Sequence, residues 1–124
     1  MDGLLLFAHG ARDPAWARPF ETIAAQLRMT RPGTPLALAY LEFMSPGIEA
    51  AAAQLVSAGC ARVHVLPLFL GTGGHVRRDV PPLLERLREQ HGDAVTWLLH
   101  PPLGEHDTVL RAIGEACLST LEER

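Results

Sequence analysis

Lysine is absent from this chain of 124 residues, and arginine carries all of its fixed side-chain positive charge. The 11 basic residues are outnumbered by 14 acidic ones, which gives a net charge of −3 at pH 7. This balance excludes the basic excess that a nucleic-acid-binding surface requires. Arginine nevertheless suits an anionic small molecule, because its planar guanidinium matches the geometry of a carboxylate.

Long hydrophobic runs are also absent. The apolar stretches LLLF, LALAYL and VHVLPLFL are far shorter than the roughly 20 residues that cross a bilayer, so we expect no contact with a membrane. The N-terminal MDGLLLFAHG lacks the basic segment of a secretion signal, and the cytoplasm is the expected location. Cysteine is scarce: Cys60 and Cys117 do not form a CxxC pattern, and both are expected to be small core residues.

Short apolar runs alternate along the chain with segments in which apolar residues recur at helical spacing. The runs predict strands at residues 3–8, 35–41, 62–68 and 94–99. A helical segment follows each strand, and the last one contains residues 109–117. Strict alternation with right-handed crossovers predicts an α/β fold, a four-stranded parallel sheet with helices on both faces. Neither a linker nor a repeat divides the sequence, so residues 1–124 are expected to form a single domain.

Two Asp-Pro or Ser-Pro pairs predict helix starts. Asp13 precedes Pro14, and Ser45 precedes Pro46, so each pair offers a capping side chain followed by a proline in the first helical position. The third helix is expected to end near Gly92, where glycine provides a C-terminal cap.

Three polar residues follow three different predicted strands: His9, Glu42 and His75. The ligand crevice of an open parallel sheet lies outside the carboxyl ends of its strands, so these residues converge if their strands are neighbours. Two imidazoles and a carboxylate suit a divalent ion such as cobalt, iron, nickel or zinc. The alternative is that His9 only ends a strand and that Glu42 points to solvent. A metal-handling pocket is the leading hypothesis.

The segment GTGGH before the third helix is rich in glycine but lacks both the GxGxxG fingerprint and the Walker lysine, so a nucleotide site has little support. Glycines beside a histidine and two arginines suit a bulky anionic ligand. His100 lies in the same plane as the three strand-end residues, because it ends the fourth strand. The residues predicted to bind substrate are Arg12, Gly73, Gly74, Arg77, Arg78 and His100.

The other histidines are assigned structural roles. His64 alternates within a predicted strand and is expected in the core or on a sheet face. His91 is expected to cap the end of the third helix, and His106 the start of the fourth.

Four blocks of the sequence together resemble the sirohydrochlorin chelatases. LLLFAHGARDP is similar to the opening motif of that family, and LALAYLEFMSPGIEAA to its second-strand block. VHVLPLFLGTGGHVRRDVP resembles the most characteristic segment, and WLLHPPLGEHDTVL the fourth block. The resemblance covers nearly the whole chain, and four blocks in order are more specific than any one of them.

The resemblance implies an ATP-independent chelatase that inserts a divalent ion into sirohydrochlorin, on the route to cobalamin or siroheme. It places the metal-binding and catalytic histidines on His9 and His75, and a catalytic carboxylate on Glu42. Cobalt is the expected ion, with iron or nickel as alternatives. The ion is a substrate, and no permanently bound cofactor is expected. Neutral imidazole suits this chemistry, because it can bind a metal or accept a pyrrolic proton.

The family also includes chains of about twice this length, built from two flavodoxin-like α/β halves that face each other across the site. A short chain resembles one chelatase half and is expected to pair as a homodimer, with both subunits enclosing one cavity. Two alternatives remain. A histidine phosphatase-like enzyme would have arginine directly before the histidine, where this chain has Ala8. A non-catalytic carrier of metal or tetrapyrrole would use the same ligands without turnover.

Overall fold

The computed structural model describes residues 1–71 and 73–121, and the side chains of residues 74–76 lie outside the described part. Its centre is a four-stranded parallel sheet in the order β2-β1-β3-β4. The strands are β1 (Asp2–Ala8), β2 (Leu36–Tyr40), β3 (Arg62–Pro67) and β4 (Thr96–Leu99). The three strands that precede His9, Glu42 and His75 are therefore neighbours. The predicted α/β fold is confirmed, with strand ends within two residues of those expected.

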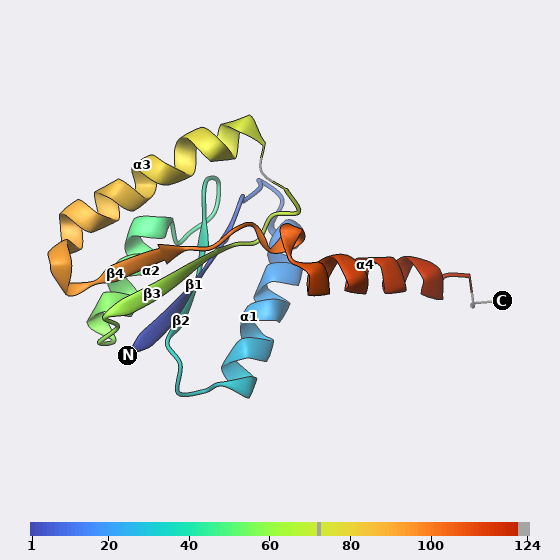
Figure 1. The fold of residues 1–124 in the computed structure, drawn as a ribbon, viewed down its shortest axis with the longest axis horizontal. Helices are drawn as coiled ribbons and strands as arrows, with labels where there is room; N and C mark the ends of the chain where they lie inside the picture. The colour runs from blue at the N-terminus through green and yellow to red at the C-terminus, as the bar shows by residue number, and fades with distance from the viewer. Residues whose placement is uncertain (72, 122–124) are drawn as a thin grey trace.

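Helices follow each strand (Figure 1). A short 3₁₀ helix, η1 (Pro14–Ala17), leads into α1 (Arg18–Thr30), and α2 (Ile48–Ser57) follows β2. After β3 comes the longest described helix, α3 (Gly74–His91), then η2 (Gly92–Ala94). After β4 come η3 (Leu103–Glu105) and α4 (Asp107–Ser119). The helices α2 and α3 cover one face of the sheet, whereas α1 lies on the other and α4 projects away from the body.

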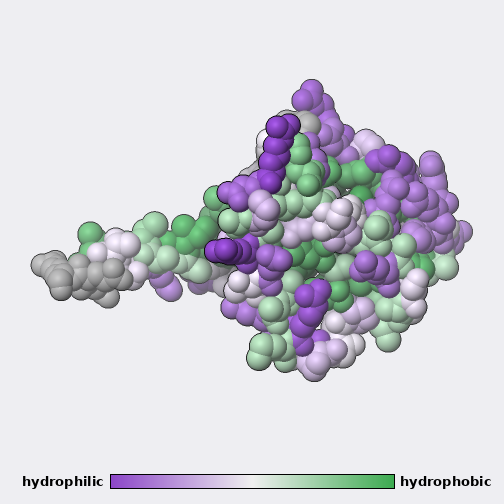
Figure 2. All heavy atoms as spheres, turned by 180° about the vertical axis from the view of Figure 1, so that it is seen from behind, coloured by the Kyte–Doolittle hydropathy of each residue, from purple (hydrophilic) through white to green (hydrophobic). Residues whose placement is uncertain are grey.

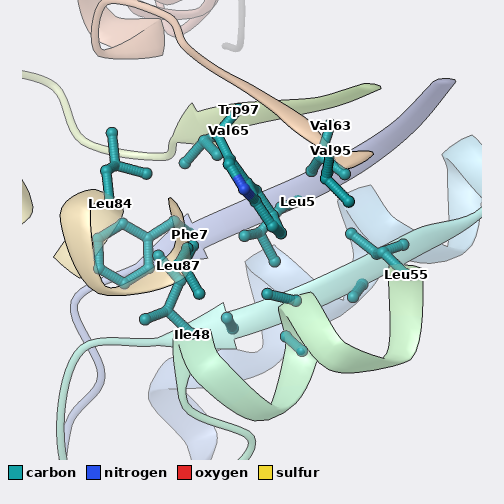
Figure 3. Close-up of a cluster of buried hydrophobic side chains, with 14 of the residues drawn as sticks. Leu5, Phe7, Ile48, Leu55, Val63, Val65, Leu84, Leu87, Val95 and Trp97 are labelled. Carbon is teal, nitrogen blue, oxygen red and sulfur yellow. The ribbon is translucent and has the colours of Figure 1, made fainter. Parts of the chain in front are cut away.

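The main core lies between the sheet and the pair α2 and α3 (Figure 3). Alternate residues of the central strands point into it, including Leu5 and Phe7 of β1 and Val63 and Val65 of β3, all fully buried. Leu87 of α3 packs against them and is also fully buried. Continuous apolar strands are expected in a parallel sheet that is covered on both faces.

The second face of the sheet is covered over only part of its width. Trp16 and Phe20 pack beside Tyr40 and Ala8 at the β2 and β1 side of this face. Toward β3 and β4 the residues of this face, such as Leu66, are only half-buried. A doubly wound sheet usually has helices across both faces, whereas in the described part of the chain only η1 and α1 pack on this one.

Of the two predicted helix starts, the one at Asp13 is confirmed and the one at Ser45 is not. Asp13 caps as expected, because its Oδ1 accepts a hydrogen bond from the Ala15 N–H at 2.9 Å, although the first turn is 3₁₀ and α1 begins at Arg18. The start at Ser45 and Pro46 is wrong. The Pro46 carbonyl accepts from the Tyr40 N–H at 2.9 Å, which holds this segment beside β2 and delays α2 until Ile48.

Two further expectations need correction. Gly74 and His75 belong to the first turn of α3 and not to a loop, because Gly73 is the N-cap and α3 begins directly after it. Cys60 is buried as predicted, but Cys117 is exposed on α4, which buries none of its residues. Across residues 1–71 and 73–121, no helix combines the length and hydrophobicity of a membrane span.

Candidate functional site

The loops after β1 and β2 are joined through their backbones. The Glu42 N–H donates to the His9 carbonyl at 3.1 Å, and the Leu41 N–H donates to the Ala8 carbonyl at 2.9 Å. Gly10 adopts a φ of 89°, and a Cβ atom at this position would lie 1.8 Å from the Glu42 carbonyl oxygen. Only glycine permits this approach. The predicted neighbourhood of His9 and Glu42 therefore exists at the level of the backbone.

The loop after β3 contacts His9 through an aromatic ring. The ring centroids of His9 and Phe69 are 4.8 Å apart, and Phe69 also meets the Phe7 ring edge-on at 5.9 Å. Phe69 is nearly fully buried, so it forms a fixed wall beside the imidazole. Phe69 was not among the predicted site residues, although a large aromatic residue just after a buried strand was a usable signal.

The loop after β4 is anchored to the loop after β3. The Gly104 N–H donates to the Phe69 carbonyl at 2.8 Å, and a Cβ on Gly104 would lie 2.0 Å from the Leu70 carbonyl oxygen. The loop after β2 thus contacts the loop after β1 at Gly10, the loop after β1 contacts the loop after β3 at His9, and the loop after β3 contacts the loop after β4 at Gly104. The four loops follow one another in the order of the strands in the sheet. The structure thus assembles one continuous rim at the carboxyl ends of the strands.

The Glu42 side chain is exposed, which agrees with the alternative that it points to solvent. The reason is the next residue: Phe43 has a φ of 67°, and the Met44 N–H donates back to the Glu42 carbonyl at 2.8 Å. This is the pattern of a γ-turn, whose positive-φ form is rare and strained. The turn leaves the Phe43 ring 58% exposed, with the Arg12 guanidinium 5.0 Å above it. An aromatic ring and a predicted substrate-binding arginine therefore share the rim.

His100 and Arg77 line one cavity of about 210 Å³ at the ends of β3 and β4. Two of the predicted substrate-binding residues are thus brought together, from different elements. Arg78 is exposed in the same turn of α3. Gly73 lies just before α3 and Gly74 at its start, and the His75 side chain lies outside the described part.

A chain of polar contacts connects His100 to the opposite end of the sheet. Its Nε2 lies 2.9 Å from Nδ1 of His64, whose Nε2 lies 2.9 Å from Oδ2 of Asp2. With neutral rings, His64 donates to the carboxylate and accepts from His100. The Arg62 guanidinium, followed by His64, lowers the pKa of Asp2 to about 2 through hydrogen bonds. His64 therefore lies on a sheet face, one of its two predicted places.

The remaining histidines lie where the sequence placed them. His91 is the last residue of α3, and Nδ1 of His106 accepts from the Thr108 N–H at 3.3 Å as the N-cap of α4. Among the described side chains, which exclude His75, no three His, Cys, Asp or Glu residues form a group that could hold a metal. A complete ligand set within one copy is therefore not visible in that part of the chain.

Comparison with known proteins identifies the family. The sequence model of the CbiX family matches residues 3–120, nearly the whole length described above. The chain belongs to the CbiX family. This CbiX-family chain is 30% identical to a protein of Saccharolobus islandicus named sirohydrochlorin cobaltochelatase, with 99% of this chain and 95% of that one covered. A protein of the same name from Methanococcoides burtonii is 24% identical, with 96% of each covered.

Solved structures agree with the family assignment. A CbiX protein from Marinobacter aquaeolei VT8 superposes with a TM-score of 0.86 and 32% identity over the full length of both chains. The sirohydrochlorin chelatase SirB from Bacillus subtilis subspecies spizizenii, in complex with cobalt, gives a TM-score of 0.81 at 20% identity. That likeness concerns the fold alone. It covers 95% of this CbiX-family chain but only 50% of SirB.

Proposed function

We propose that this CbiX-family chain is a sirohydrochlorin chelatase, an enzyme that inserts a divalent metal ion into the macrocycle. The observation that carries the proposal is the rim of four joined strand-end loops around His9, in a chain whose relatives are named sirohydrochlorin cobaltochelatase. In the reaction both pyrrolic protons leave the macrocycle and the metal takes their place. The ion is a substrate, and the proposal requires no permanently bound cofactor.

His9 and His75 are the proposed metal ligands and proton acceptors. Neutral imidazole can perform either task, and the Phe69 ring restricts the positions that the His9 ring can take. Glu42 is exposed in this copy, so we assign it the second proton or the orientation of a histidine in the loaded site. Cobalt is the proposed ion, by analogy with the names of the relatives, while iron and nickel would accept the same ligands.

Arginines are proposed to hold the carboxylates of sirohydrochlorin. Arg77 and His100 share a cavity wall, and Arg12 lies over the exposed Phe43 ring, which places a guanidinium and an aromatic ring together at the rim for the macrocycle. Arg78 is exposed one residue further along α3. No described atom lies within 4 Å of a Cβ position at Gly73, which leaves room for a bulky ligand, and Gly74 is the next residue in the proposed binding segment.

A homodimer is part of the proposal. The two hollows that His100 lines at the strand ends, about 210 Å³ and about 400 Å³, lie below or near the lower end of the roughly 300–1,000 Å³ typical of small-molecule sites. A tetrapyrrole therefore requires a second wall, which a second copy would supply with its own strand ends facing the first. The cytoplasm remains the predicted location.

The test is metal insertion followed by the change in the absorption spectrum of sirohydrochlorin with cobalt. We expect His9→Ala and His75→Ala each to lose at least about 100-fold in kcat/KM, and Glu42→Gln to lose less. Met29→Ala is the control, because Met29 is largely exposed near the end of α1, outside the strand-end loops, and should leave the rate unchanged. Wild-type rates in both histidine variants would refute the mechanism. Binding of metal or sirohydrochlorin without turnover would instead identify a carrier.

A further inference from the structure

Helix α4 carries an apolar stripe that stays exposed, and none of the residues of this helix is buried in the described part of the chain. Leu110, Ile113, Cys117 and Leu118 recur at helical spacing and fall on one side of the helix. Leu110 is 50% exposed, Ile113 42% and Leu118 64%. Figure 2 shows hydrophobic side chains along the projecting helix. An amphipathic helix gains most of its stability by burying such a stripe, so an isolated α4 is an incomplete structure.

The segment before α4 directs this helix away from its own sheet. Gly104 packs against the backbone of Leu70 so closely that a Cβ would lie 2.0 Å from the Leu70 carbonyl oxygen. The His106 N–H donates to the Leu103 carbonyl at 3.1 Å, and the His106 ring caps the helix. The helix therefore leaves the body from an anchored turn at the carboxyl ends of the strands (Figure 1).

The sheet face beside α1 is only partly covered toward β3 and β4, and it has half-buried leucines around the hydrogen-bonded His64. Leu4, His64 and Leu98 are register partners across β1, β3 and β4, and none of the three is fully buried. One hollow of about 390 Å³ opens at the Leu4 and His64 end of this face, and another of about 400 Å³ at the Leu66 and His100 end. We call this half of the face the open groove.

We propose that α4 of each copy lies in the open groove of a second copy, so that two chains exchange their last helices. The assignment rests on the homodimer proposed above and names the surfaces that form it. The lengths agree: α4 has 13 residues and is about 20 Å long, and the 6 residues of β3 also span about 20 Å. Each chain lacks one helix on its sheet and has one helix without a sheet, so a reciprocal exchange completes both and closes as a dimer.

The area is consistent with such a dimer. A stripe about 20 Å long and about 10 Å wide has an area of about 200 Å². Each of the two contacts buries this area on the helix and again on the groove, so the exchange buries about 800 Å² of surface in total. Stable interfaces bury about 1,200–2,000 Å². The facing strand-end loops, including the exposed Phe43 and Leu70, supply apolar surface for the remainder.

The first test compares two neighbouring positions of α4 by light scattering during gel filtration, without substrate. Ile113→Glu puts a charge in the stripe, and Ala112→Glu puts the same charge on the opposite side of the helix, where Ala112 is exposed. We expect the wild type and Ala112→Glu to be dimers and Ile113→Glu to shift at least about tenfold toward monomer. Circular dichroism should show a folded body in both variants.

The second test uses Cys117 as a probe, because Cys60 is buried. Leu98→Cys or Leu66→Cys in the groove should be joined to Cys117 of the other copy by a short bismaleimide, and replacing Cys117 by serine should abolish the product. A dimer that survives Ile113→Glu and gives no such cross-link would overturn the exchange but leave the homodimer. A monomeric wild type would overturn both. Chelatase activity is measured separately, so loss of the proposed reaction would not be mistaken for either result.

Discussion

At the scale of single residues, two glycines hold the rim together by close backbone packing. Gly10 meets the Glu42 carbonyl, and Gly104 meets the backbone of Leu70, at distances that exclude any Cβ. Each glycine connects loops from different strands. The position of His9 relative to Glu42 therefore depends on the absence of a side chain next to the histidine.

Gly10→Ala is predicted to destabilise the fold by about 2 kcal/mol or more, because the added methyl would overlap the Glu42 carbonyl at a φ of 89°. Urea unfolding measures the loss, and metal insertion should fall as well. Gly33→Ala is the matched control, because nothing lies within 4 Å of its Cβ position. Equal midpoints for the two variants would show that the approach of the loops is not rigid.

The carboxylate of Asp2 has a pKa well below its usual range. Its pKa falls from 3.8 to about 2, with the Arg62 hydrogen bonds as the first cause and His64 as the second. A folded-state pKa below the unfolded value means that the ionised carboxylate favours folding above pH 3.8. This contribution disappears as the pH falls through about 2.

Arg62→Ala is predicted to raise the pKa of Asp2 toward 3.8, because it removes the main partner of the carboxylate. A carboxyl carbon NMR titration measures the value directly. Arg86→Ala, which removes a pairing with Glu49 elsewhere, should leave the Asp2 titration as it is in the wild type. The same curve in all three proteins would show that Arg62 does not hold this carboxylate.

At the scale of elements, α3 supports the core and also presents candidate site residues. Its N-terminal turns contain His75, Arg77 and Arg78, and its later turns bury Leu84 and Leu87 against the sheet. Pro81 and Pro82 separate the two parts and lack the N–H groups that would bond to the carbonyls of the preceding turn. The site half and the core half of the helix are therefore not one continuous hydrogen-bonded unit.

Leu87→Ala is predicted to cost about 2–5 kcal/mol of unfolding free energy, because this side chain is fully buried and its removal leaves a cavity. Met29→Ala in α1 serves as the control, since Met29 is largely exposed and should change stability by less than about 0.5 kcal/mol. A small loss at Leu87, measured by urea unfolding, would mean that the core collapses around the deletion.

At the scale of the whole molecule, one copy contains a single set of strand-end loops and a sheet face that is only partly covered. SirB, which shares the fold, is about twice as long as the region that matches this chain. A tetrapyrrole site shared between two copies would make activity depend on assembly. The concentration of protein then becomes a variable of the reaction itself.

Specific activity is predicted to fall on dilution, by about half when the chain concentration reaches the dissociation constant of the dimer. Initial rates of metal insertion over a dilution series, beside light scattering on the same samples, test this relation. Activity per chain that stays constant into the monomeric range would show that one copy forms a complete site.

The local sequence was sufficient to predict the four strands and the caps at Asp13 and His106, but not the start of α2. Strands that are buried on both faces are continuous apolar runs, so β1 to β4 were readable to within two residues. The Asp13 cap was readable because it involves only residues that are adjacent in the chain. The predicted strands also placed His9 and Glu42 just after strand ends.

Contacts between residues that are far apart in the sequence could be established only from the tertiary structure. The pairing of β1, β3 and β4 brings His64 within hydrogen-bond distance of both Asp2 and His100. The turn at Phe43, beside the exposed Glu42, lies where the loops after β1 and β2 meet. The apolar spacing of α4 indicated a helix with one side to bury, and the burial of Cys117 was wrongly expected from it. Helical periodicity can be recognised from the local sequence. The direction of α4 depends instead on the packing of Gly104 against Leu70, which lies far away in the sequence, so the sequence did not predict which surface the helix contacts.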